Sequence, residues 1–307
     1  METRVLRYFL AVAREQNISA AADTLFRSQP ALSRQMMELE RDLGVRLFNR
    51  GQKGRKLELT EEGLLLKKRA EEIMIHLEKT ENEIKSSFED LSGDLYIGAG
   101  ESPSFDLIAR TCTIFMKQYP NVQIHLYSGN ADDVRHRLDN GILDYGLFIG
   151  NVLMDGLEYL TFTARDEWGI LISSEHPLAE KSAIKPEDLN NVALLVSEQS
   201  RNDDLFTGWL RRELQSLNIV GRYNLVYNAS LLAAENAGAV LSLKGLVSSC
   251  MRRELRFIPL DPPLYASLNL AWRSSHDLSR QARIFLNLLQ NEMQSSPGFM
   301  HPTHSLR

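Results

Sequence analysis

The chain reads Ile18-Ser-Ala-Ala-Ala-Asp-Thr-Leu-Phe-Arg-Ser-Gln-Pro-Ala-Leu-Ser-Arg-Gln-Met-Met-Glu-Leu-Glu-Arg-Asp-Leu-Gly44 near its amino terminus. This stretch contains two short helical patterns joined by a tight turn, which is typical of a helix-turn-helix that reads DNA. In the second pattern the apolar residues recur at steps of four, three and four, so they share one helix face that can pack inward. They are Leu32, Met36, Leu39 and Leu43.

The second helix has start and stop signals at both of its ends. Ser28 is placed to cap it, Pro30 lies in its first turn, and Gly44 ends it. The face opposite the apolar one carries Pro30, Arg34, Met37 and Arg41. The amino end of this helix is therefore expected to be free to meet DNA.

The side chains at this amino end suit the recognition of bases. Arg34 can hold a guanine edge and Gln29 an adenine edge with two hydrogen bonds each, and such a pair discriminates against a wrong base by about 1–3 kcal/mol. Ser28 and Ser33 are expected to touch phosphates.

A basic hairpin is predicted directly after this helix. Residues 48–57, Phe-Asn-Arg-Gly-Gln-Lys-Gly-Arg-Lys-Leu, read as a strand, a glycine-rich turn and a second strand. Its tip is basic, which indicates a wing beside the recognition helix. An amphipathic helix pair is usually only core and a charged loop only solvated surface, but here both occur together with outward arginines. The candidate DNA-binding residues are Ser28, Gln29, Pro30, Ser33, Arg34, Arg50, Lys53 and Arg55.

The first fifth of the chain closely resembles the LysR-type transcriptional regulators, and the remainder fits that family's effector-binding domain through layout rather than motif. Two residues depart from the family pattern. Arg27 stands at a turn position that usually carries a small apolar residue, and Met37 stands where a basic residue is common. The resemblance is carried by Leu6-Arg-Tyr-Phe-Leu-Ala-Val-Ala13, Ser28-Gln-Pro-Ala-Leu-Ser33, Leu39-Glu40, Leu43-Gly-Val-Arg-Leu-Phe48 and Leu59-Thr-Glu-Glu-Gly63.

The charge of the chain is unevenly distributed. The net charge of the 307 residues is −5, yet residues 1–60 hold eleven basic against seven acidic residues and so carry +4. A basic head on an acidic body keeps the attraction for the phosphate backbone at one end of the protein. Binding to DNA should therefore weaken steeply with salt.

Composition indicates an ordinary globular protein of about two domains. The sequence shows no apolar run long enough to span a membrane and no secretion signal, so a cytoplasmic location without membrane contact is expected. Cys112 and Cys250 both lie among apolar neighbours, at a spacing that fits neither a metal site nor a redox pair. We interpret them as small core residues, with a thiol sensor as the less favoured alternative.

A long helix is predicted from Glu61 to about Phe88, because neither proline nor glycine occurs between Gly63 and Phe88. Its apolar seam suits pairing with another helix, and the resemblance implies that linker helices of this kind pair in a homodimer. Packing on its own domain is the alternative. The seam consists of Leu66, Ala70, Ile73, Leu77, Thr80 and Ile84.

Beyond residue 94 short apolar runs alternate with helical stretches, which predicts doubly wound α/β layers. The predicted strands lie at 95–99, 122–127, 145–149, 168–172, 192–196 and 223–227, and the predicted helices near 103–118, 131–140, 202–216 and 230–237. The resemblance implies two lobes, similar to periplasmic solute-binding proteins. The fold class expected for the whole chain is therefore α/β with an amino-terminal all-α winged helix-turn-helix, a long linker helix and a two-lobed effector domain.

We expect four parts along the chain. They are the DNA-binding domain at 1–60, the linker at 61–91, the effector domain at 92–294 and a flexible tail at 295–307. Within the effector domain, lobe I is expected at 92–161 and 268–293, and lobe II at 162–267.

The expected effector site is the cleft between the lobes, because ligands of open α/β sheets bind beyond the carboxyl ends of strands. Ser102 as a cap and Pro103 at the first helical position are expected to leave unpaired amides pointing into this cleft. Serine and asparagine at helix starts can also be plain caps. The candidate effector-binding residues are Glu101, Ser102, Ser128, Asn130, Gly150, Ser200, Arg201, Asn202 and Asn228.

The charge of the effector is left open by the sequence. Effectors of the family are often small carboxylates, which Arg201 could hold. Glu101 would repel such an anion unless it points away from the cleft, and it could instead pair with an amine.

An enzyme is the main alternative class, but the chain lacks a phosphate-binding Gly-x-x-x-x-Gly-Lys-Ser/Thr loop, a Gly-x-Ser-x-Gly elbow and a His-Glu-x-x-His pair. We therefore expect no enzyme, no catalytic residue, no cofactor and no metal, and assign His301 and His304 to the tail. An architectural DNA protein and a solute-binding protein without DNA contact are further alternatives. The expected partners are double-stranded promoter DNA, a small-molecule effector, a second copy in a homodimer or homotetramer, and RNA polymerase.

Overall fold

A computed structural model describes residues 2–49, 57–85, 91–150, 155–198, 200, 204–247, 254–273 and 278–295. The chain forms two compact units, Met1–Lys85 and Ser86–Arg307. Within the described residues no helix is long and apolar enough to cross a membrane, and no group of side chains could hold a metal ion. Several residues predicted to have a role lie outside the described residues. They are Arg50, Lys53 and Arg55 of the expected wing, Arg201, Asn202, Cys250, and the tail with His301 and His304.

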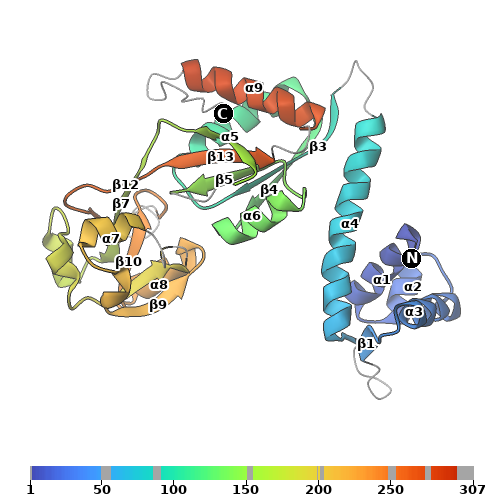
Figure 1. The fold of residues 1–307 in the computed structure, drawn as a ribbon. Helices are drawn as coiled ribbons and strands as arrows, with labels where there is room; N and C mark the ends of the chain where they lie inside the picture. Colours follow the sequence, from blue (N-terminus) through green and yellow to red (C-terminus); the bar gives the residue numbers. More distant parts are fainter. Residues whose placement is uncertain are drawn as a thin grey trace. The chain divides into compact units, whose positions relative to one another are not determined.

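The first unit is a three-helix bundle followed by a short β-ribbon and a long helix (Figure 1). Its elements are α1 (Thr3–Glu15), α2 (Ile18–Thr24), α3 (Gln29–Leu43), β1 (Phe48–Asn49), β2 (Glu58–Leu59) and α4 (Glu61–Lys85). Strands β1 and β2 pair in an antiparallel ladder. The helix-turn-helix expected from the sequence is confirmed.

The apolar face of α3 packs inward as its spacing predicts, with one exception. Leu32, Met36 and Leu39 are buried together with Phe9 of α1, whereas Leu43 is 41% exposed, so its assignment to the core is wrong. Leu43 is the last residue of the helix, and the chain turns away from the helix at Gly44, which has a φ of 70°.

The seam of α4 divides into two parts. Its first turns pack on the unit's own helices, where Ala70 is fully buried and Leu66 is partly buried. Farther along the same seam, Ile73 is 39% exposed and Ile84 is 80% exposed. Packing on its own domain, the alternative in the sequence analysis, therefore holds for the start of α4.

The second unit contains two mixed sheets, which we call the first and the second lobe with the helices that cover them. The sheet of the first lobe has the order β4-β3-β5-β13-β6. Its strands are β3 (Ser92–Ala99), β4 (Asn121–Ser128), β5 (Tyr145–Ile149), β6 (Leu157–Thr161) and β13 (Leu268–Arg273). Helices α5 (Phe105–Gln118) and α9 (Arg280–Ser295) cover one face and α6 (Ala131–Asp139) the other (Figure 1).

The sheet of the second lobe has the order β11-β7-β10-β8-β9, and β12 also pairs with β7. Its strands are β7 (Asp166–Ser173), β8 (Leu194–Ser197), β9 (Ile219–Tyr223), β10 (Ala239–Leu243), β11 (Leu255–Pro259) and β12 (Tyr265–Ala266). Its helices are α7 (Asp204–Leu210) and α8 (Val226–Ala234), with 3₁₀ turns at Pro177–Glu180, Pro186–Leu189 and Leu214–Ser216. The chain enters this sheet from β6 and returns from β12 to β13.

One strand predicted from the sequence is wrong. The apolar run at 223–227 was expected to be a buried strand, but β9 ends at Tyr223 and α8 begins at Val226. A short apolar run has no period long enough to separate strand from helix, so its tertiary surroundings decide.

Candidate DNA-reading surface and interlobe pocket

The predicted base-reading residues lie together at the amino end of α3. Gln29, Pro30 and Arg34 are exposed, as is Ser28 at the cap position, and Ser33 is half-buried. Arg34 has no ion-pair or hydrogen-bond partner among the described residues, so its guanidinium stays available. Ser28 does not cap the helix through its side chain; its carbonyl oxygen accepts from the amides of Ala31 and Leu32, both at 3.1 Å.

The turn between α2 and α3 has a feature that sequence reasoning missed. Phe26 is 95% exposed and has a φ of 52°, a left-handed conformation that bulky side chains rarely adopt. Arg27, which departs from the family pattern, places its guanidinium 5.9 Å from the ring centroid of Tyr8. That contact gives Arg27 a role within the head.

Glu40 connects the recognition helix to the wing. Its Oε1 atom accepts hydrogen bonds from the amides of Leu47, at 2.8 Å, and Phe48, at 3.2 Å. These amides lead into β1, so the carboxylate fixes where the hairpin leaves the helix. The motif Leu39-Glu40 was noted in the sequence only as part of the family resemblance, and this structural role of Glu40 was not predicted from it.

The start of α4 is held against the segment that leads into β1. Thr60 donates from Oγ1 to the carbonyl oxygen of Arg46 at 2.7 Å and accepts from the amide of Gly63 at 3.0 Å. A Cβ atom on Gly63 would lie 2.2 Å from the carbonyl oxygen of Leu47. The motif Leu59-Thr-Glu-Glu-Gly63 therefore joins helix and wing through close backbone approach.

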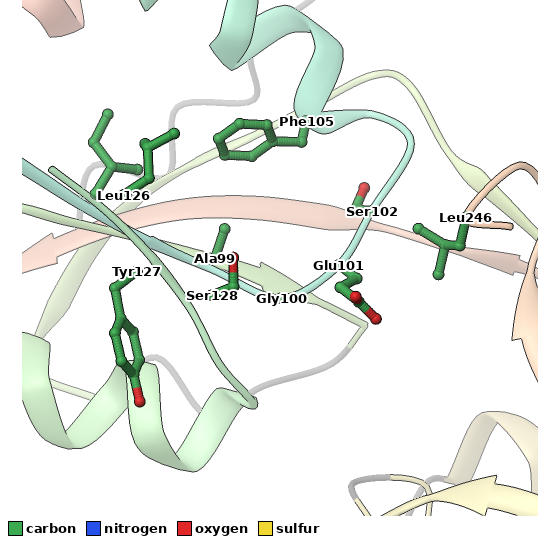
Figure 2. Close-up of a pocket in the computed structure, with 10 residues that line it drawn as sticks. Ala99, Gly100, Glu101, Ser102, Phe105, Leu126, Tyr127, Ser128 and Leu246 are labelled. Atoms are coloured by element: carbon green, nitrogen blue, oxygen red, sulfur yellow. The ribbon is translucent and has the colours of Figure 1, made fainter. Parts of the chain in front are cut away.

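A pocket of about 290 Å³ lies where the β3–α5 loop meets the second lobe (Figure 2). Of the nine effector candidates, the structure brings Glu101, Ser102 and Ser128 into its wall. The apolar lining was not predicted, because it comes from β3, β4, the start of α5 and a loop of the second lobe, which only the folded chain brings together. The lining residues are Ile97, Ala99, Gly100, Glu101, Ser102, Phe105, Leu126, Tyr127, Ser128 and Leu246.

Glu101 lines the pocket and bridges the two lobes. Its Oε2 atom accepts a hydrogen bond of 2.6 Å from the amide of Val226, the first residue of α8. The positive end of the α8 dipole favours the carboxylate there. Burial, and to a lesser extent the Glu101 charge, raise the pKa of the Tyr223 phenol well above its usual value.

Asp166, at the start of β7, makes a second link between the lobes. Its two carboxylate oxygens accept from the hydroxyls of Ser102 and Ser104, at 2.5 and 2.6 Å. Both Asp166 and Ser102 are buried. Asp166 was not among the predicted site residues, because its only sequence signal is an acid two residues before the apolar run at 168–172.

The expectation that unpaired amides of α5 point into the cleft is wrong. The helix begins at Phe105, and the amides of Ser104, Phe105 and Asp106 are paired with Ser102 Oγ and with the carbonyl oxygens of Ser102 and Pro103. A tight turn before the helix satisfies these groups internally.

The remaining described candidates do not line the pocket. Asn130 caps α6 by accepting from the amide of Asp133 at 2.8 Å, and the amide of Gly150 donates to Ser267. Ser200 is buried, and Asn228 is exposed in the first turn of α8. Asn130 therefore acts as a helix cap, which the sequence analysis gave as the alternative to ligand binding.

The chain thus combines a helix-turn-helix head that carries a β-ribbon with a two-lobed α/β body that contains a pocket. Two family models match the chain: "Bacterial regulatory helix-turn-helix protein, lysR family" at residues 3–64 and "LysR substrate binding domain" at residues 88–294. The chain belongs to the LysR family.

Curated relatives carry regulator names. One from Synechocystis sp., "Probable RuBisCO transcriptional regulator", is 37% identical over 60% of this chain and 53% of its own length. A protein of the same name from Thalassiosira pseudonana is 29% identical over 81% of this chain and 82% of its own length. The matched region spans only 53 to 62% of the length of the first four such relatives.

Solved structures share the fold. The regulator CbnR bound to its target DNA superposes with a TM-score of 0.74 at 21% identity, over 95% of this chain and 100% of that one. Full-length BenM superposes with a TM-score of 0.55 at 24% identity, over 99% of this chain and 100% of that one.

Proposed function

We propose that this protein is a sequence-specific DNA-binding transcriptional regulator whose promoter binding is modulated by a small molecule held between its lobes. The observation that carries the proposal is the exposed amino end of α3, where Gln29 and Arg34 stand on a helix anchored by its buried opposite face. Relatives named as regulators and a neighbour bound to target DNA support it.

The proposed DNA contacts divide by chemistry. Arg34 and Gln29 read base edges, Ser28 and Ser33 touch phosphates, and Pro30 lies against the groove. The basic wing adds phosphate contacts through Arg50, Lys53 and Arg55.

Replacing Arg34 tests the reading of DNA. Arg34→Ala should weaken binding to selected genomic fragments by about 1–3 kcal/mol and relax sequence preference at one base pair. Arg14→Ala is the matched control, because Arg14 lies in the last turn of α1 and pairs with Glu15. Selection of bound fragments followed by sequencing and affinity measurement gives the answer; unchanged affinity and preference in Arg34→Ala would overturn the proposal.

The effector acts by preferring one arrangement of the lobes, since a ligand shifts only an equilibrium whose states it binds unequally. The proposed contacts are Glu101, Ser102 and Ser128, with Asn130, Gly150, Ser200, Arg201, Asn202 and Asn228 as secondary candidates. The chain is divided into the parts 1–60, 61–91, 92–294 and 295–307. It acts in the cytoplasm as a homodimer or homotetramer, with RNA polymerase as a further partner.

A further inference from the structure

The wall of the interlobe pocket combines apolar surface with a single carboxylate. Most of the lining is apolar, and Glu101 is the one charged residue among the described lining residues. Ser102 and Ser128 add hydroxyl groups. Figure 2 shows the Glu101 carboxylate on the loop that also carries Ser102, whereas Ser128 lies at the end of β4. At about 290 Å³ the pocket is at the small end of the range for ligand sites, so it suits a body the size of one ring.

The helix amino termini around this pocket already hold acidic groups of the chain itself. Glu101 accepts from the first amide of α8, and Asp166 accepts the hydroxyls of Ser102 and Ser104 in front of α5. Helix α6 carries Asp132 and Asp133 in its first turn. A carboxylate ligand would therefore meet negative charge where such a ligand normally finds free amides.

Glu101 keeps the capacity to bind a ligand. A carboxylate offers about four acceptor positions, and the described residues supply one hydrogen bond to it, from Val226. The nearby Tyr223 hydroxyl donates to the carbonyl oxygen of Leu241 instead, at 2.6 Å. Arg137 lies over the ring of Tyr127, 4.0 Å from its centroid, and is not among the lining residues.

We propose that the pocket binds a small molecule that carries a protonated amine on an apolar body, with the Glu101 carboxylate as its counter-ion. The apolar part lies against Phe105, Leu126 and Leu246, and the ammonium group faces Glu101. This inference rests on the effector role proposed for the cleft, and it names the class of ligand.

Three probes with the same ring separate the charge classes: benzylamine, benzyl alcohol and benzoate. Their binding to the full-length chain is measured by titration calorimetry at low salt. Benzylamine should bind at least tenfold more tightly than benzoate, because the Glu101 carboxylate attracts an ammonium group and repels a carboxylate.

Two variants and one control locate the effect. Glu101→Gln keeps an acceptor for the Val226 amide but removes the charge, and should weaken benzylamine at least tenfold while leaving benzyl alcohol unchanged. Glu180→Gln is the control, because Glu180 is exposed in the 3₁₀ turn Pro177–Glu180. Ser128→Trp fills the pocket from an exposed position and should remove binding of every probe.

Benzoate binding as tightly as benzylamine, or a benzylamine affinity that Glu101→Gln leaves unchanged, would overturn the inference. If Ser128→Trp then removes benzoate binding, the cleft still takes an effector and only the ligand class is wrong. If Ser128→Trp alters the binding of no probe, the cleft role itself fails, while the Arg34 experiment still judges DNA binding separately.

Discussion

Gly63 lies where two backbone segments of the head approach closely. Because a Cβ atom there would sit 2.2 Å from the Leu47 carbonyl oxygen, Gly63→Ala should force α4 away from the segment leading into β1. We expect a loss of about 1–3 kcal/mol in the stability of the first unit. Faster hydrogen exchange in residues 2–49 would report it.

Gly208 provides the matched control for this substitution. It lies in α7 with no atom within 4 Å of the added Cβ, so Gly208→Ala should be neutral or stabilising by up to about 1 kcal/mol. Equal exchange in Gly63→Ala and the native chain would contradict the close-approach argument.

Cys112 illustrates how burial sets chemistry at a single residue. Burial raises the pKa of its thiol from 9.0 to about 11, so the thiol stays protonated near neutral pH and the core role expected from the sequence is confirmed. Alkylation by iodoacetamide should be slow at pH 8 in the folded chain and fast in urea. Peptide mass spectrometry measures both rates.

The same shift affects stability at high pH. Since the folded state holds this proton more tightly than the unfolded state, its contribution is complete below pH 9 and is lost as the pH rises toward 11. Cys112→Ala should therefore lose less stability than the native chain over that interval. Parallel losses in the two proteins would contradict the assignment.

At the scale of elements, α4 has an exposed apolar part without a described partner. Ile73 and Ile84 lie on the seam beyond the turns that Leu66 and Ala70 bury in the head. If this part pairs with a second copy, Ile73→Glu together with Ile84→Glu should shift the protein toward monomer. Analytical ultracentrifugation at several concentrations measures the shift.

Leu65 offers a control on another face of the same helix. Leu65 is 60% exposed and is not one of the seam residues, so Leu65→Glu should leave the oligomeric state unchanged. Dissociation by Leu65→Glu but not by the seam variant would place the pairing surface elsewhere.

At the scale of the whole second unit, two side-chain links hold the lobes together. Asp166→Ala leaves the buried Ser102 hydroxyl without its acceptor, at a cost of about 1–3 kcal/mol. Residues 100–107 should then exchange amide hydrogens faster. Asp139→Ala is the control, because Asp139 is 48% exposed and its pair with Arg135 joins two turns of the same helix, α6, rather than the two lobes; equal exchange in both variants would argue against the link.

The helix-turn-helix was predictable because its signals are local. Apolar spacing sets the inner face of α3, and Gly44 marks its end. The same holds for β3, β4, β5, β7 and β8 of the body, whose apolar runs are bounded by turns. The other described strands of the body, β6 and β9 to β13, were not predicted from the sequence. Asn17 is another example of such a local signal, because its side chain caps α2 by accepting hydrogen bonds from the amides of Ser19 and Ala20, only two and three residues away.

The pocket and the links between the lobes could not be read in this way. Glu101 and Val226 are 125 residues apart, and Ser102 and Asp166 are 64 apart, so only the folded chain brings them together. Periodicity shows which side of a helix or strand is buried but not which distant group will face it. The sequence alone therefore predicted the helix-turn-helix head and the alternation of strands and helices in the body. Only long-range packing in the folded chain determines which residues line the pocket, that the Glu101 carboxylate lies in it, and that this carboxylate caps the amino end of α8.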